Sequence, residues 1–96
     1  MMIRYRLTPK AKEDLRSIWS FIALDNVDAA DSVEGAIYDT CAYLAKAPLR
    51  GHSREDLTKL PVRFWTVLRY PKYVIVYDPA DKPLKIVRIL HGARKR

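Results

Sequence analysis

The pattern of apolar and polar positions at the start of the chain predicts a strand that runs directly into a helix. Residues 3–7 alternate apolar side chains with arginines, and this period of two is typical of a half-buried strand. Thr8 is a suitable N-cap, and Pro9 fits the first helical position because its missing N–H costs nothing there. The apolar positions that follow share one helical face, which we expect to lie in the core: Ala11, Leu15, Ile18, Trp19 and Ile22.

A second helix is predicted between Asn26 and Pro48. Asp25 and Asn26 end the first helix, Asn26 or Asp28 can cap the second, and Pro48 cannot continue it. Because the turn between the helices is short, they are expected to lie antiparallel, with their apolar seam facing a sheet. The stripe that forms this seam consists of Ala30, Val33, Ile37, Cys41 and Leu44.

Three strands are predicted in the second half of the chain, at 64–68, 73–77 and 84–90, because these segments are rich in aromatic and β-branched residues. Residues 49–61 are expected to form a loop or a single helical turn, and 70–72 and 78–83 to form turns. The alternation in the last strand places Leu84, Ile86, Arg88 and Leu90 on one face.

The predicted order is therefore β-α-α-β-β-β, an α+β fold in which the helical hairpin packs on one face of an antiparallel sheet. The last three strands form a meander because their connections are short. The first strand must join this sheet, but the sequence does not say beside which neighbour.

Length and composition limit the class of protein. With 96 residues the chain forms one domain, 1–96, and no apolar stretch approaches the roughly 20 residues that span a bilayer. The charged N-terminus is unlike a signal peptide, so a cytoplasmic protein without a membrane partner is expected. The single cysteine, Cys41, excludes a disulfide framework and a cysteine-based zinc site. We expect no metal and no cofactor, and we interpret Cys41 as a small buried hydrophobe.

The net charge of +7 is unevenly distributed along the chain. Residues 1–43 carry five basic and seven acidic side chains, whereas residues 44–96 carry thirteen and four. This asymmetry favours an anionic partner for one face, such as nucleic acid, a nucleic-acid enzyme or an acidic protein. The alternative interpretation is a surface charge that only keeps the protein in solution.

Four segments resemble a known family. Residues 8–15 read TPKAKEDL, residues 48–57 read PLRGHSREDL, residues 73–77 read YVIVY, and residues 86–94 read IVRILHGAR. In this order they resemble the RelE/ParE superfamily of toxins from bacterial type II toxin–antitoxin pairs, over nearly the whole chain. The closing segment is most similar to the ParE-like branch, which binds DNA gyrase, whereas the RelE-like branch cleaves messenger RNA on the ribosome.

The resemblance favours the binding branch. RelE-like nucleases place an arginine after the first tyrosine of the Tyr-x-x-x-Tyr strand and a tyrosine near the C-terminus, whereas this chain has Val74 and ends in Ala-Arg-Lys-Arg. The resemblance therefore implies a gyrase-binding toxin without catalysis, held by a cognate antitoxin in a hetero-oligomer. One alternative is a ribosome-dependent endoribonuclease that acts on messenger RNA through Arg69, His91 and Arg94. A further alternative is a non-toxic family member that only forms complexes.

Candidate binding residues follow from this interpretation. If the face that carries Arg88 is covered by the helices, Arg88 needs a carboxylate partner, and if that face is open, Arg88 is a binding residue. Either Trp65 or Phe64 must face away from the helices. The candidates for binding the target are Arg63, Trp65, Arg69, Arg88, His91 and Arg94. The antitoxin is expected to wrap the helical hairpin and add a strand to a sheet edge, contacting Leu15, Trp19, Ile22, Ile37 and Tyr38.

Overall fold

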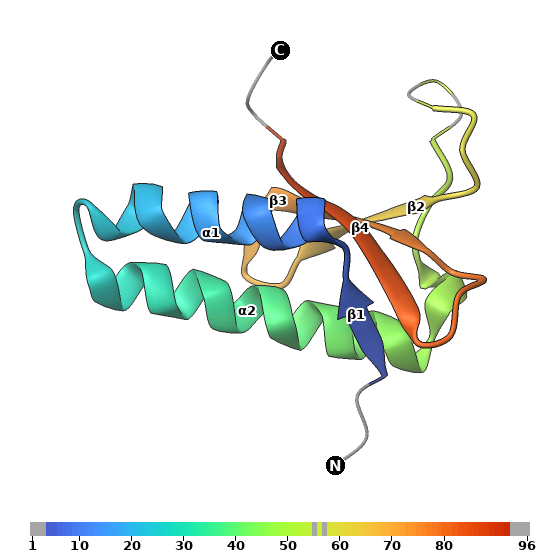
Figure 1. Cartoon of the computed structure of the whole chain (residues 1–96), viewed down its shortest axis with the longest axis horizontal. Helices are drawn as coiled ribbons and strands as arrows, with labels where there is room; N and C mark the ends of the chain where they lie inside the picture. Colours follow the sequence, from blue (N-terminus) through green and yellow to red (C-terminus); the bar gives the residue numbers. More distant parts are fainter. Residues whose placement is uncertain (1–3, 55, 57, 93–96) are drawn as a thin grey trace.

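The predicted order of elements is confirmed by a computed structural model, which describes residues 4–54, 56 and 58–92 (Figure 1). Ile3 and Arg94 lie outside the described residues. A 3₁₀ turn, Pro48–Arg50, follows the second helix, in agreement with the single helical turn expected in the connector between the second helix and the next strand. The elements are β1 (Tyr5–Leu7), α1 (Pro9–Ala23), α2 (Val27–Lys46), β2 (Arg63–Val67), β3 (Tyr70–Asp78) and β4 (Leu84–His91).

The four strands form one sheet in the order β1-β4-β3-β2. The antiparallel meander of β2, β3 and β4 is confirmed, and β1 joins its edge in parallel with β4, so the sheet is mixed rather than wholly antiparallel. The parallel pairing arises because the chain passes through both helices and a hairpin before β4 returns beside β1 in the same direction. Hydrogen bonds from Thr8 N to Ile86 O at 3.0 Å and from Leu84 N to Arg4 O at 2.9 Å extend this pairing.

The predicted N-caps are confirmed in both helices. The Thr8 hydroxyl accepts a hydrogen bond from Ala11 N at 3.0 Å and donates one to Val87 O at 2.9 Å, so it fixes the start of α1 against β4. The Asn26 side chain accepts from Ala29 N at 3.0 Å and starts α2. The Thr8 cap therefore sets where α1 begins relative to the sheet, and the Asn26 cap sets where α2 begins along the chain.

The turn between β2 and β3 lies earlier than predicted. It falls at Leu68 and Arg69, and Arg69 adopts a positive φ of 70°, whereas 70–72 belong to β3. Thr66 pairs with Val74 while the next residue, Val67, pairs with Tyr70, so β3 carries an irregularity opposite this step. Pro71 lies within that irregularity, where the missing N–H of a proline breaks no ladder hydrogen bond.

A bulge in β4 changes which residues share a face. Val76 pairs with Arg88 and Tyr77 pairs with Ile86, so Val87 is an extra residue in β4. Leu84 and Ile86 are buried before the bulge, and Ile89 is buried after it. The expected common face of Ile86, Arg88 and Leu90 is therefore wrong, because one inserted residue reverses the alternation beyond it.

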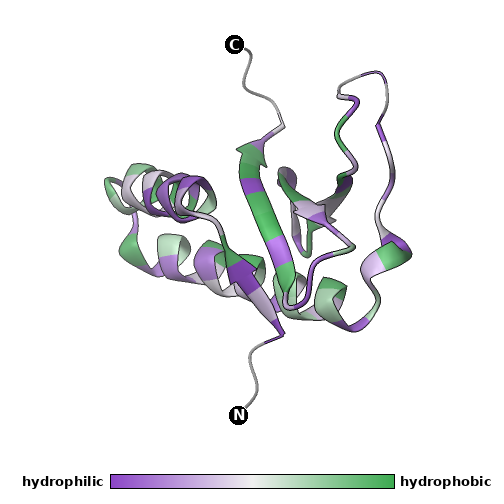
Figure 2. Ribbon diagram, turned by 45° about the vertical axis from the view of Figure 1, so that its right-hand side comes forward, coloured by the Kyte–Doolittle hydropathy of each residue, from purple (hydrophilic) through white to green (hydrophobic). Residues whose placement is uncertain are grey.

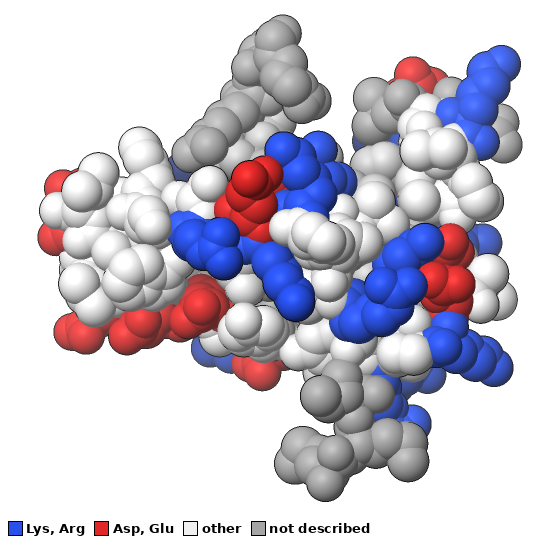
Figure 3. All heavy atoms as spheres, viewed as in Figure 1, with Lys and Arg blue, Asp and Glu red and all other residues white. Residues whose placement is uncertain are grey.

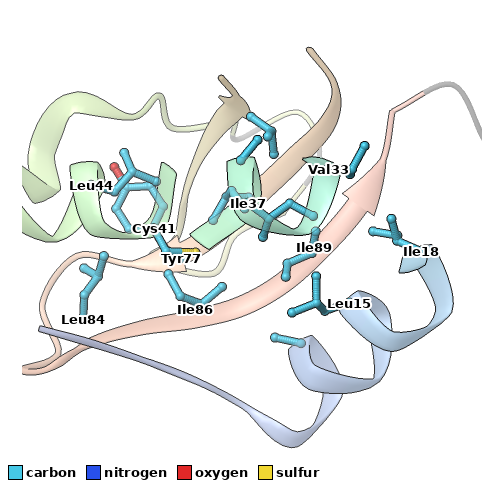
Figure 4. Close-up of a cluster of buried hydrophobic side chains, with 14 residues drawn as sticks. Leu15, Ile18, Val33, Ile37, Cys41, Leu44, Tyr77, Leu84, Ile86 and Ile89 are labelled. Atoms are coloured by element: carbon cyan, nitrogen blue, oxygen red, sulfur yellow. The ribbon is translucent and has the colours of Figure 1, made fainter. Parts of the chain in front are cut away.

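The core lies between the sheet and the helical hairpin, and α2 covers the middle of the sheet (Figure 4). The predicted stripe of α2 is buried throughout. On α1 the prediction holds for Ala11, Leu15 and Ile18, whereas Trp19 is only half-buried. The indole of Trp19 lies toward α2 and donates a hydrogen bond to Asp31 Oδ1 at 2.9 Å. Trp19 is therefore a surface residue that links the two helices.

Tyr77 fastens the connector after α2 to the centre of the sheet. Its ring is fully buried, and its hydroxyl donates to Pro48 O at 2.6 Å and accepts from Gly51 N at 2.8 Å. A Cβ atom at Gly51 would lie 2.5 Å from Tyr77 Oη and 3.0 Å from Phe64 O, so only glycine fits here without displacement. The chain beyond Gly51 then pairs His52 with Phe64 at the edge of β2.

The buried thiol of Cys41 makes the stability of the fold pH-dependent. Burial raises the pKa of Cys41 to about 12, from an ordinary value of 9.0. Above about pH 9 the unfolded chain loses a proton that the folded chain keeps, so stability falls as pH rises, by at most about 1.4 kcal/mol per pH unit from this group. Urea unfolding of the wild-type chain between about pH 8 and pH 11 should show this fall. The Cys41→Ala variant should show a shallower fall, and equal slopes for the two chains would contradict the argument.

Candidate functional site

A groove of about 1150 Å³ runs along β1, between α1 and α2. We call it the β1 groove. In the sheet of the described residues, β1 is an edge strand with β4 as its only neighbour, so its second edge is available to a further strand. The apolar part of the lining comes from Tyr5, Leu7, Leu15, Trp19 and Tyr38.

The lining of the β1 groove is cationic. Two acidic residues, Asp31 and Glu34, and five basic residues line it, the latter being Arg4, Arg6, Lys12, Arg16 and Lys46. Most of these cations come from the first half of the chain, although acidic residues outnumber basic ones there. Figure 3 shows acidic side chains gathered along the lower edge, where α2 begins, and lysine and arginine side chains across the middle of the same face. The fold therefore groups basic side chains in one part of this face, a grouping that a count of charges along the sequence does not show.

The structure brings three of the five residues predicted to bind antitoxin into this groove: Leu15, Trp19 and Tyr38. Ile37 is fully buried in the core, so it cannot contact a partner while the protein is folded, and the prediction that it binds the antitoxin is wrong. Ile22 packs against the core from the surface without lining the groove. The cations around β1 were missed because they become neighbours only once β1 is placed at the sheet edge beside both helices.

A second groove lies on the face of the sheet opposite α2 and encloses about 850 Å³. We call it the sheet groove. In Figure 2, β4 runs between α1 on one side and the loop before β2 on the other, and these two segments flank the groove. Thr66 pairs with Val74 and Val74 pairs with Leu90, so these three side chains form one row across β2, β3 and β4. Phe64 extends the floor along β2.

Arg88 reaches the sheet groove, and Asp14 of α1 binds it there with two hydrogen bonds. Arg88 Nε lies 2.6 Å from Asp14 Oδ2, and Nη2 lies 3.0 Å from Oδ1. The same carboxylate accepts from Ile89 N at 3.0 Å, and its side chain is only 12% exposed. The hydrogen bond with Asp14 raises the pKa of Arg88. This geometry is the bidentate form that holds a guanidinium most firmly, so Arg88 is paired even though it lies on the open side.

His91 and Trp65 also line the sheet groove, and the ring of Trp65 packs against the core. The His91 ring meets Tyr73 edge-on at 5.0 Å between ring centroids. Trp65 lies 6.2 Å from Tyr43 of α2 and 5.8 Å from His52, which stacks on it. The aromatic ring that faces away from the helices in β2 is therefore that of Phe64.

The remaining predicted target-binding residues lie apart from this groove. Arg63, at the start of β2, donates to Gly51 O at 2.7 Å, and Arg69 occupies the exposed turn between β2 and β3. Neither residue lines the β1 groove or the sheet groove. Arg94 lies outside the described residues, so the members of the predicted set that the structure brings together along the sheet groove are Trp65, Arg88 and His91.

None of the helices in residues 4–54, 56 and 58–92 is long and apolar enough to cross a membrane. Within the same residues, His, Cys, Asp and Glu side chains form no group of three that could hold a metal ion.

Comparisons with known proteins agree with this architecture. No curated protein matches the chain. A solved structure of the chromosomal ParDE toxin–antitoxin system from P. aeruginosa matches with 24% sequence identity and a TM-score of 0.73, over 94% of this chain and 96% of the other, which shows a shared fold. The family model of the ParE toxin of the type II toxin–antitoxin system parDE matches residues 5–96. The chain therefore belongs to the ParE toxin family of type II toxin–antitoxin systems.

Proposed function

We propose that this toxin arrests growth by binding DNA gyrase, without cleaving nucleic acid, and that a cognate antitoxin neutralises it. The observation that carries the proposal is the match of the ParE family model to residues 5–96, since gyrase binding is the action of the ParE-like branch. The paired state of Arg88 supports an action by binding, because a phosphate-cleaving site needs a cation free to stabilise charge on the reacting phosphate.

The antitoxin is proposed to occupy the β1 groove. Trp19 and Tyr38 offer aromatic contact area, the edge of β1 can accept a further strand, and the excess of basic side chains suits an acidic segment. A segment that folds only on binding can follow such a long groove, and its carboxylates would pair with the surrounding arginines and lysines.

The test is induced expression followed by two assays in parallel, on supercoiling by purified gyrase and on the integrity of messenger RNA. We expect the purified toxin to inhibit supercoiling, the antitoxin to relieve this inhibition, and messenger RNA to remain intact. Messenger RNA cut in the ribosomal A site would replace the proposal with an endoribonuclease acting through Arg69, His91 and Arg94. Normal growth on induction would instead indicate a family member that only forms complexes.

A further inference from the structure

We propose that the sheet groove is the surface through which the toxin binds its target, and that it takes an apolar protein segment rather than nucleic acid. This inference rests on the proposed function and deepens it. The volume of about 850 Å³ lies within the range of ligand-binding clefts in proteins. Phe64, Val74 and Leu90 provide an apolar floor between two walls formed by α1 and the loop before β2.

The charges around the sheet groove favour an apolar protein segment. The two arginines of its lining, Arg54 and Arg88, are each bound by an aspartate through two hydrogen bonds. Arg54 Nε and Nη2 lie 3.0 Å and 2.8 Å from the carboxylate oxygens of Asp56. A nucleic-acid strand gains its affinity from lysines and arginines that are free to pair with phosphates. Asp14 holds the guanidinium of Arg88 in a partly buried pair, whereas the pair of Arg54 and Asp56 is exposed and neutralises Arg54 only weakly. The firmly paired Arg88 and the apolar floor together complement an uncharged, apolar surface.

The sheet groove is separate from the β1 groove, and α1 forms a wall of each. Asp14, Ser17 and Ile18 line the sheet groove, whereas Leu15 and Trp19 line the β1 groove on the other side of the helix. The two linings share no residue. A substitution in the sheet groove can therefore weaken target binding without touching the β1 groove. Unchanged antitoxin binding then shows that the variant is correctly folded.

The experiment places opposite charges at one exposed position of the sheet groove. Thr66 is exposed on the edge strand β2, so Thr66→Arg and Thr66→Glu leave the core intact. We expect both variants to inhibit gyrase at least tenfold more weakly than wild type, because either charge must lose its hydration against an apolar partner. Both should bind antitoxin as wild type does. Ser32→Arg and Ser32→Glu, at an exposed position of α2 outside both grooves, are the matched controls and should inhibit as wild type does.

Each of the other outcomes would contradict a specific claim about the binding surface, its occupant or the target. Full inhibition by both Thr66 variants would show that the target binds elsewhere. Weakening by Thr66→Glu together with equal or stronger inhibition by Thr66→Arg would indicate an anionic partner and overturn the apolar occupant. If the wild-type chain arrests growth without inhibiting gyrase, the proposed target is wrong, and growth arrest by the same four variants still tests the groove. If the wild-type chain arrests no growth, both proposals fail.

Discussion

Replacing Tyr77 with phenylalanine is expected to lower the free energy of unfolding by about 3 kcal/mol, because two buried backbone groups would each lose a partner at about 1–3 kcal/mol. The hydroxyl of Tyr77 donates a hydrogen bond to Pro48 O and accepts one from Gly51 N, and the Tyr77 side chain is fully buried. Urea unfolding at neutral pH measures the change. Tyr43→Phe is the matched control, since the ring of Tyr43 contacts Trp65 but takes no part in this bridge.

Gly51→Ala tests the same bridge from the other side. The added Cβ would lie 2.5 Å from Tyr77 Oη and 2.9 Å from Cε1, so the connector or the ring must shift. Overpacking of this kind costs about 1–3 kcal/mol. Because both substitutions act on one contact, the double variant should be less destabilised than the sum of the two. Additive effects, or a loss below about 1 kcal/mol for Tyr77→Phe, would contradict the importance of the bridge.

The Tyr77 bridge also shows where prediction from the sequence ends. Pro48 and the glycine that follows predict that α2 stops and that a loop begins, because both signals act within a few residues. The hydrogen bond from Gly51 to Tyr77 joins residues 26 positions apart, and no local pattern encodes it. The elements and their order could therefore be predicted, whereas the contacts that fix the connector could not.

The errors in the strands have the same origin. The extra residue at Val87 and the positive φ of Arg69 are imposed by pairing with β3, and each displaces the local prediction by one or two positions. This displacement decides the environment of Arg88. The sequence left two possibilities open for that side chain, buried with a carboxylate or open for binding. The bulge places it on the open side, where Asp14 from a distant segment still binds it.

The candidate site was only partly predictable, because its charge depends on how the chain folds. Counts along the sequence assigned the positive charge to residues 44–96, yet four of the five cations of the β1 groove lie at positions 4–16. The cations become one surface when β1 pairs with β4 and α1 follows it, and only two of the acids of α2, Asp31 and Glu34, line the same groove. Figure 3 shows acidic side chains gathered along the lower edge of this face. Two aromatic members of the groove, Trp19 and Tyr38, were named as antitoxin contacts, although the helical spacing had placed Trp19 in the core and the structure leaves it half-buried.

Replacing Trp19 with alanine is expected to weaken antitoxin binding by about a hundredfold, the loss typical of a central aromatic residue in an interface. Trp19 is half-buried and lines the β1 groove together with Leu15 and Tyr38, so removing the indole takes a large aromatic contact area out of the groove. Titration of the purified toxin with its cognate antitoxin measures the affinity. In cells, the variant should still arrest growth, and the antitoxin should no longer restore it.

Two further variants separate the contributions to this loss. Trp19→Phe keeps a ring in the groove but removes the N–H that binds Asp31, so an intermediate affinity is expected. Leu24→Ala is the matched control, because Leu24 is 85% exposed beyond the end of α1 and does not line the groove.

For the wild-type chain, raising the salt concentration from about 50 to about 500 mM should weaken antitoxin binding, because salt screens the attraction between the cations of the β1 groove and an acidic partner. Unchanged affinity for Trp19→Ala would place the antitoxin on another surface, and unchanged affinity in high salt would remove the cations of the β1 groove from its recognition.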